Sequence, residues 1–332
     1  GGIFLTGSLR YNHSKVENTL STPAEGIEEL VAQPKESFNY SKLNPALGIS
    51  AKLDNGLNLF ANASQGNRVP TVIELGCADK DNPCLLPTGL QADPFLEQVI
   101  SRTYEVGARG RIGQGFGIIS IYNTDNKDDI IFVSTDVNSG QGFFTNFGKT
   151  RNQGLDLQIV QEFNQIKITG NYSYLEATYE ESGLLFGERS VQALPGMRIP
   201  GIPENVFRLG VDWTPQDDLK IGLAFIATSD LVTQGNEDGQ IGGDDDVITR
   251  DASVDGYQLV NVNVRYERSE NLTIFARVTN LFDEKYETYG AMAESAFNKN
   301  GNFVDDEEGP TVNRFVAPGA PRGVFIGLNY KF

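Results

Sequence analysis

The chain has 332 residues and a formal net charge of −17, from 44 acidic and 27 basic side chains. This acidity argues against nucleic acid and against an anionic membrane surface as partners. No stretch approaches the roughly 18 uninterrupted apolar residues of a membrane-spanning helix. The sequence therefore predicts neither a nucleic-acid-binding protein nor a helical membrane protein.

Apolar residues recur at every second position along nearly the whole chain, from the run at 57–61 to the terminal run at 324–332. A period of two is typical of β-strands that have one apolar and one mainly polar face. We count about twelve strands, near residues 3–17, 41–53, 57–65, 103–112, 115–133, 143–163, 165–179, 204–214, 218–229, 256–268, 271–287 and 321–332.

The connections between these strands alternate in length. Short turns are expected at 54–56, 113–115, 163–165, 215–218 and 269–271. Long polar connections are expected at 18–40, 66–102, 180–203, 230–255 and 288–320. The pattern indicates consecutive hairpins with tight turns at one end of the sheet and long loops at the other.

What the apolar face contacts decides the fold class. In a soluble β-sandwich or adhesin the apolar face packs on a protein core, and in a membrane barrel it contacts lipid. Several strands have ten or more residues, which suits a tilted crossing of a bilayer. Aromatic residues near the strand ends suit interfacial girdles: Trp213, Tyr266, Tyr286, Tyr289, Tyr330 and Phe332. We therefore predict an all-β, antiparallel up-and-down transmembrane β-barrel, with the soluble sandwich as the alternative.

Two cysteines, Cys77 and Cys84, flank a segment rich in Asp, Asn and Pro. Together they cannot supply the four ligands of a structural zinc site, and the single histidine, His13, is distant in sequence. A disulfide that closes the loop is expected, which implies an oxidising compartment, and two free thiols are the alternative.

The residues for catalysis are scarce. One histidine, in a strand-like stretch, makes a Ser-His-Asp triad improbable. The near-match to a dinucleotide-binding glycine motif at 109–117 is explained by a tight hairpin. We predict that the protein is not an enzyme and has no cofactor.

An acidic cluster lies in the long connection 230–255 and includes Asp238, Asp244, Asp245 and Asp246. Solvated loops explain it without a ligand. The second interpretation is a structural calcium site, because hard cations favour clustered carboxylates, although the spacing does not match an EF-hand.

Several stretches together resemble the TonB-dependent outer-membrane receptors. They are "SKLNPALGISAKL" (41–53), "ASQGNRVPTVIELGC" (63–77), "RTYEVGARGRI" (102–112), "TRNQGLDLQ" (150–158), "VTNLFDEKYETYG" (278–290) and the terminal "PRGVFIGLNYKF" (321–332). Each motif is weak alone, but they appear in the order of the family.

The resemblance implies a barrel of about 22 strands with an N-terminal plug domain. Since about twelve strands and no plug are visible, residues 1–332 are interpreted as the C-terminal portion of such a barrel. The implied function is TonB-coupled uptake of a scarce nutrient, a ferric siderophore first, across the outer membrane of a Gram-negative bacterium. The alternatives are a carbohydrate or cobalamin receptor, and a passive porin or adhesin barrel.

The resemblance also implies roles for individual residues. Loop aromatic and basic side chains could contact the ligand: Tyr179, Phe186, Arg189, Arg198, Phe297, Phe303, Arg314 and Phe315. Loop packing is the alternative for each. Arg68 and Glu74 are expected to be structural, with Arg68 in an ion pair or hydrogen bond near the loop base. The terminal Phe332 would be the signal for the barrel-assembly machinery.

Overall fold

The computed structural model describes the chain except residues 20, 24–29, 33–35, 82, 86–94, 137–140, 187–190, 238–252, 296, 298–300 and 304–310. The proposed calcium ligands Asp238, Asp244, Asp245 and Asp246, and the candidate Arg189, lie outside the described residues. No helix among the described residues has the length and apolar character needed to span a bilayer.

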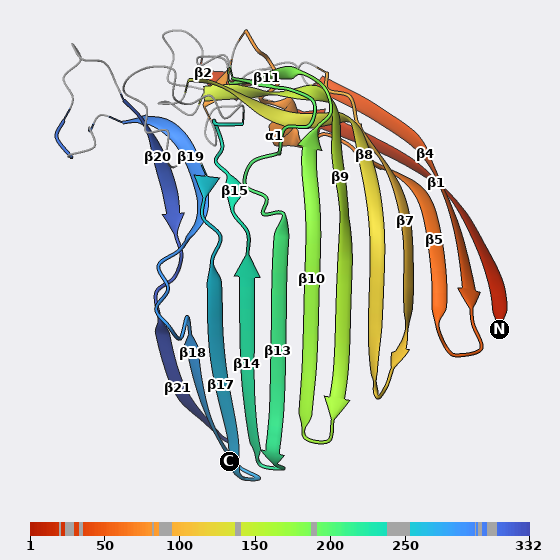
Figure 1. The fold of residues 1–332 in the computed structure, drawn as a ribbon. Helices are drawn as coiled ribbons and strands as arrows, with labels where there is room; N and C mark the ends of the chain where they lie inside the picture. The colour runs from red at the N-terminus through yellow and green to blue at the C-terminus, as the bar shows by residue number, and fades with distance from the viewer. Residues whose placement is uncertain are drawn as a thin grey trace.

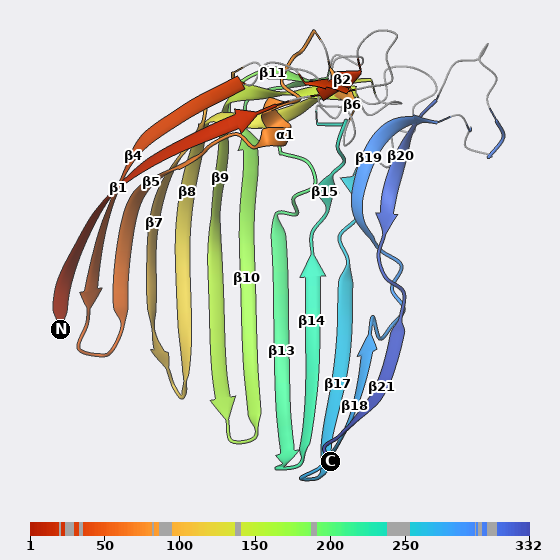
Figure 2. The ribbon, with the colours of Figure 1, turned by 180° about the vertical axis from the view of Figure 1, so that it is seen from behind.

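Twelve long strands form one curved antiparallel wall (Figure 1, Figure 2). In spatial order they are β1 (Gly2–Asn18), β4 (Glu36–Lys52), β5 (Asn58–Arg68), β7 (Val99–Ile112), β8 (Gly115–Asp136), β9 (Gln141–Phe163), β10 (Ile166–Tyr179), β13 (Asn205–Gln216), β14 (Leu219–Thr228), β17 (Gln258–Ser269), β18 (Leu272–Thr279) and β21 (Gly323–Tyr330). Neighbours in this order are also consecutive wall strands in the sequence. The predicted antiparallel up-and-down fold is confirmed.

The strand register gathers the apolar side chains on one face. Across the middle of the wall, Val211 lies opposite Leu223, which lies opposite Val262 on the next strand. Aromatic residues bound this apolar face, with Tyr104 and Tyr174 toward the long-loop end and Trp213 and Tyr330 toward the short turns. Many of these apolar side chains are exposed, as expected when lipid replaces a protein core.

The five predicted short turns are correct. Each connects neighbouring wall strands at the lower end of Figure 1. Gly113 in the β7–β8 turn has φ +60°, and Asn164 in the β9–β10 turn has φ +48°. Glycine and asparagine are the residues that reach this left-handed region most readily, so the turn chemistry matches the sequence.

The long connections that we predicted as loops contain further secondary structure. Beside one helical turn, α1 (Val72–Leu75), they contain seven strands of two to four residues and two longer ones: β2 (Ser21–Pro23), β3 (Leu30–Ala32), β6 (Cys84–Leu85), β11 (Gly183–Phe186), β12 (Val191–Ala193), β15 (Leu231–Val232), β16 (Ser253–Val254), β19 (Glu287–Ser295) and β20 (Thr311–Pro318). The pair β19–β20 is a hairpin that rises above β18 and β21 (Figure 1). The strands of this hairpin lack a clean alternation of apolar and polar residues, so the period of two in the sequence did not predict the hairpin.

The predicted strand at 271–287 is wrong in its second half, because β18 ends at Thr279. Asn280 follows with φ +50° and Asp283 with φ +57°, so the backbone turns there. Tyr286 therefore lies outside the wall, where its ring packs at a tilt against that of Tyr257 with centroids 4.4 Å apart, and does not belong to a girdle.

The two edges of the wall are β1 and β21. Within the described residues, β1 pairs only with β4 and β21 only with β18, so the terminal strand does not pair with the first. Phe332 lies two residues beyond the end of β21 and is fully exposed, with its ring 5.2 Å from that of Tyr330.

Candidate functional site

The long-loop end of the wall is the candidate functional site, because it gathers the side chains proposed to contact a ligand. Tyr179, at the end of β10, is only 5% exposed and packs edge-to-face on Phe147, with ring centroids 5.1 Å apart. Leu185 and Ala193 complete this small buried cluster. Tyr179 therefore anchors the β11–β12 segment on the wall and does not present its ring to solvent.

Arg198 lies just above β10, where its segment forms a bridge with Thr178. Its guanidinium group contacts two carboxylates, Glu204 at 3.2 Å and Asp230 at 3.3 Å, and donates a hydrogen bond to the carbonyl oxygen of Asp230. These contacts connect the ends of two neighbouring hairpins, and the two carboxylates compensate the positive charge of Arg198.

Arg314 of β20 also forms an ion pair and donates a hydrogen bond to a backbone carbonyl oxygen. It lies 3.1 Å from a carboxylate oxygen of Glu287 on β19 and donates a 2.6 Å hydrogen bond to the carbonyl oxygen of Ser253 on β16. The arginine therefore connects the β19–β20 hairpin to the β15–β16 pair.

Tyr289 and Gln234 form a second connection that the sequence did not suggest. The hydroxyl of Tyr289, on β19, donates to the side-chain oxygen of Gln234. The backbone of Gln234 also bonds to Gly290 at 3.0 Å and to Met292 at 2.8 Å. We had interpreted Tyr289 as a girdle residue, and its place in the hairpin corrects that interpretation.

Three of the proposed aromatic residues are open to solvent. Phe297 and Phe303 are 54% and 70% exposed and face each other edge-on, with ring centroids 6.1 Å apart. Phe315, on β20, is 49% exposed. Phe186 lies in β11, whose backbone alone is described at that position. Among the proposed ligand-contact residues whose side chains are described, the exposed aromatic rings therefore come from the β19–β20 region.

The base of the β5–β7 connection is fixed by a hydrogen-bonded cluster. Arg68, the last residue of β5, donates to both carboxylate oxygens of Glu74, at 2.9 and 2.8 Å. Glu74 also accepts from the backbone N–H of Thr71 at 2.7 Å, and the Thr71 hydroxyl accepts from the N–H of Glu74, which forms a capping box on α1. The arrangement orients the chain as it leaves the wall.

Burial raises the pKa of Glu74, but the hydrogen bonds from Arg68 and Thr71 outweigh it and hold that pKa below its ordinary value of 4.5. A carboxyl group with a depressed pKa in the folded protein stabilises it above the unfolded pKa, and this stabilisation is lost as the pH falls through the folded pKa.

We expect amide exchange at Thr71 and Glu74, corrected for intrinsic rates, to be unchanged from about pH 7 to 5 and to accelerate below about pH 4. Hydrogen-exchange mass spectrometry of the folded protein measures this. A Glu74→Gln variant, which has no carboxyl group to protonate, should show no such acceleration, and identical profiles for both proteins would contradict the prediction.

A disulfide joins Cys77 to Cys84, and both cysteines are buried. Next to the bridge, the carbonyl oxygen of Cys77 accepts from the N–H of Phe144 at 2.6 Å, and Cys84 pairs with Gly142 on β9. The bridge thus holds the loop after α1 against the long β9 strand. The described residues contain no group of three or more His, Cys, Asp or Glu side chains placed to hold a metal ion.

The family described as "TonB dependent receptor-like, beta-barrel" matches residues 1–281. The chain belongs to the TonB-dependent receptors. Members and structural neighbours of this family are receptors and transporters, not enzymes.

Solved structures with the same fold include two receptors and one transporter. The ferric yersiniabactin uptake receptor FyuA from Yersinia pestis aligns at a TM-score of 0.68 with 17% identity, over 99% of this chain and 43% of FyuA. The ferric-catecholate import receptor Fiu from E. coli K12, in its closed form, aligns at a TM-score of 0.65 with 17% identity, over 99% of this chain and 42% of Fiu. The copper transporter OprC aligns at a TM-score of 0.67 with 17% identity, over 99% of this chain and 46% of OprC. The chain thus spans less than half the length of these proteins.

Proposed function

We propose that this TonB-dependent receptor chain is part of an outer-membrane barrel that imports a ferric siderophore, with energy supplied through TonB. The observation that carries the proposal is the match of the receptor family over residues 1–281 on a wall with one continuous apolar face. Such a face suits lipid, and the matched family gives the barrel its uptake role.

The long-loop end supports the choice of ligand. Exposed aromatic rings at Phe297, Phe303 and Phe315 can stack on the aromatic or conjugated groups of a chelator. Arg198 and Arg314 are neutralised by carboxylates of the chain, so in this proposal they hold the loops and leave direct ligand contact to the aromatic residues. FyuA and Fiu are receptors of ferric chelates, and OprC is a copper transporter, so the fold alone does not choose the cargo.

The remaining parts of the proposal concern the whole receptor. The plug domain, the contact with TonB and the other strands of a barrel of about 22 would be supplied by sequence outside these 332 residues. Phe332, exposed beyond the last strand, would be recognised by the barrel-assembly machinery.

The test is uptake by cells that lack the receptor gene. Under iron limitation, we expect the complete gene to restore growth on one or more ferric siderophores from a panel, and a triple Phe297→Ser, Phe303→Ser, Phe315→Ser variant to reduce uptake about tenfold at an equal amount of folded receptor. Restoration only by copper, a carbohydrate or cobalamin would replace the siderophore. Growth that does not require TonB would contradict energy coupling.

A further inference from the structure

A pocket lies at the base of the β19–β20 hairpin, where this hairpin begins with the pairing of Glu287 and Pro318. Its cavity of about 600 Å³ is lined by the stretch before β17, the turn after β18 and the stretch from β20 to β21. A volume of this size suits a small-molecule group. Phe297 and Phe303 lie beyond the far end of the same hairpin, so the pocket is distinct from those exposed rings.

Two tyrosines and two prolines form the apolar part of the pocket. Tyr257 and Tyr286 pack with ring centroids 4.4 Å apart, and both side chains remain partly exposed. The N–H of Gly319 donates a 2.7 Å hydrogen bond to the carbonyl oxygen of Tyr286, and a side chain at position 319 would clash with the Tyr286 ring. Pro318 and Pro321 also line the cavity. The aromatic surface is therefore held in place by the backbone around it.

Four carboxylates and two cations line the same pocket. The carboxylate of Glu287 pairs with Arg314 at 3.1 Å, and Lys285 is the second cation. The other three carboxylates are exposed and belong to Asp255, Asp283 and Glu284. In the part of the chain that the structure describes, no Lys or Arg side chain lies within ion-pair distance of these three. The pocket therefore keeps a net negative charge.

This charge favours a cationic ligand group over an anionic one. The two loop arginines that could attract an anion, Arg198 and Arg314, are compensated by carboxylates of the chain, and the net charge of the chain is −17. A cation finds exposed carboxylates beside the electron-rich faces of two tyrosine rings, and such rings attract ammonium groups.

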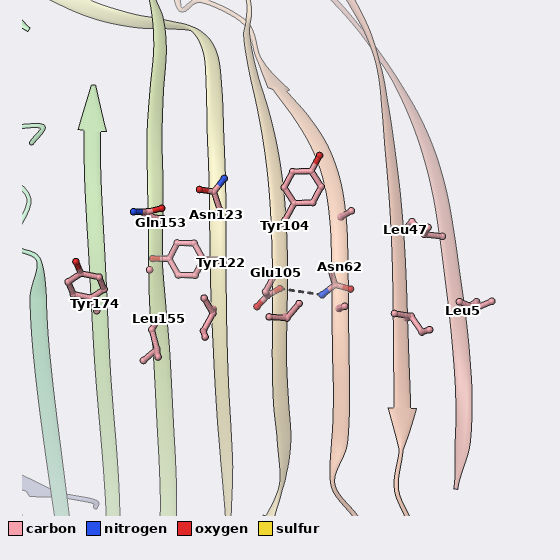
Figure 3. Close-up of a pocket in the computed structure, with 16 residues that line it drawn as sticks. Leu5, Leu47, Asn62, Tyr104, Glu105, Tyr122, Asn123, Gln153, Leu155 and Tyr174 are labelled. Atoms are coloured by element: carbon pink, nitrogen blue, oxygen red, sulfur yellow. Dashed lines mark hydrogen bonds between the residues drawn. The ribbon is translucent and has the colours of Figure 1, made fainter. Parts of the chain in front are cut away.

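A larger hollow of about 890 Å³ crosses the wall from β1 to β10 (Figure 3). It is lined mainly by hydrocarbon, with Leu5, Leu47 and Leu155 among its side chains. In the proposed barrel this apolar face contacts lipid, so the hollow does not suit a charged group of a soluble ligand.

From this geometry we propose that the pocket at the base of the β19–β20 hairpin binds the ammonium group of an amine-bearing ferric chelate. The ammonium group lies against the rings of Tyr257 and Tyr286, and the carboxylates of Asp255 and Glu284 accept its hydrogen bonds. A ferric tris-hydroxamate with a terminal amine has this chemistry, because its iron-bearing core is neutral and its amine is protonated at neutral pH. The inference rests on the proposed function, since it takes the ligand to be a ferric chelate.

The experiment compares two ligands that differ only at the amine. The complete receptor, purified in detergent, is titrated by calorimetry with ferrioxamine B and with its N-acetylated form, which keeps the iron-bearing core and lacks the positive charge. We expect ferrioxamine B to bind about tenfold more tightly, because a cation contacts both aromatic rings and carboxylates. An anionic ferric tris-catecholate should bind more weakly than either.

Two variants of the pocket separate the carboxylates from the rings. Asp255→Asn combined with Glu284→Gln should remove the preference for ferrioxamine B. Tyr257→Leu keeps every carboxylate and should reduce the preference about threefold. Each variant is judged by the ratio of its two affinities, so a smaller amount of folded protein does not imitate the effect.

The matched control is Asp217→Asn combined with Glu270→Gln. These two acidic residues are exposed and lie in the β13–β14 and β17–β18 turns, at the opposite end of the wall. The control removes the same side-chain types and the same charge as the double variant of the pocket. Because exposed charges that far away are screened by salt, the preference should stay at its wild-type value.

Equal affinities of the wild-type receptor for the amine and its acetylated form, or tighter binding of the tris-catecholate, would overturn the cationic ligand. Equal effects of the pocket variant and the control variant would overturn the site. The proposed function fails in a different way, by the absence of binding and uptake of every ferric chelate.

Discussion

Leu223→Arg is expected to lower the free energy of unfolding of the membrane-inserted receptor by about 2 to 4 kcal/mol, the cost of a charged side chain on the lipid face near the bilayer midplane. Leu223 lies in the middle of β14, between Val211 and Val262, and is 39% exposed on the apolar face. This substitution tests the assignment of the two faces more directly than any other in the wall.

The control is the next residue of the same strand. Ala224 points to the polar face, where its register partners are Gly210 and Asn261. Since that face offers water and polar groups, and since Gly210 leaves room, Ala224→Arg should change the free energy of unfolding by less than about 1 kcal/mol. Urea unfolding of the complete receptor in lipid vesicles, followed by tryptophan fluorescence, provides both values. A larger effect of Ala224→Arg than of Leu223→Arg would reverse the assignment of the faces.

The wall could be predicted from the sequence because its strands and turns are specified by residues that are neighbours in the sequence. Alternation in β13, β14 and β17 decides which side chains share a face, and Gly113 or Asn164 marks where the chain turns back. The same rules fail at the loop end, where strand pairs such as β19–β20 have no regular alternation of apolar and polar residues.

The candidate site was less predictable for the same reason. The resemblance to the receptor family suggested Arg198 and Arg314 as ligand contacts, because basic side chains in its loops can pair with anionic ligands. Asp230 lies 32 residues from Arg198 in sequence, and the convergence of neighbouring hairpins brings the two together. Glu287 lies 27 residues from Arg314, and the pairing of β19 with β20 brings these two together. Arg68 and Glu74 are only six positions apart, and the capping box of Thr71 with Glu74 is a local signal that was present in the sequence.

The end of β18 shows how one side chain can override a strand pattern. Asn280 is buried and donates from its amide to the carbonyl oxygens of Glu284 at 2.8 Å and Ala320 at 3.1 Å, while its side-chain oxygen accepts from the N–H of Glu284 at 2.8 Å. Ala320 is 40 residues away and leads into β21. Asn280 therefore closes the turn after β18 and holds the entry to the terminal strand.

Asn280→Ala should consequently destabilise the receptor by about 3 kcal/mol, since it removes three hydrogen bonds and places alanine at φ +50°, where asparagine is better tolerated. Asn280→Asp keeps the acceptor for Glu284 and should have a smaller effect. Asn271→Ala is the matched control, because Asn271 donates only one hydrogen bond, to Lys331 at the short-turn end of the same two strands.

The same urea titration measures all three variants, and hydrogen exchange along 311–330 locates the change. If Asn280 connects β18 to β21, its loss should expose the amides at the start of β21 before those of β17. Equal destabilisation by Asn280→Ala and Asn271→Ala would show that the turn does not depend on this side chain. Faster exchange confined to β19–β20 would indicate that Asn280 supports the hairpin and not the terminal strand.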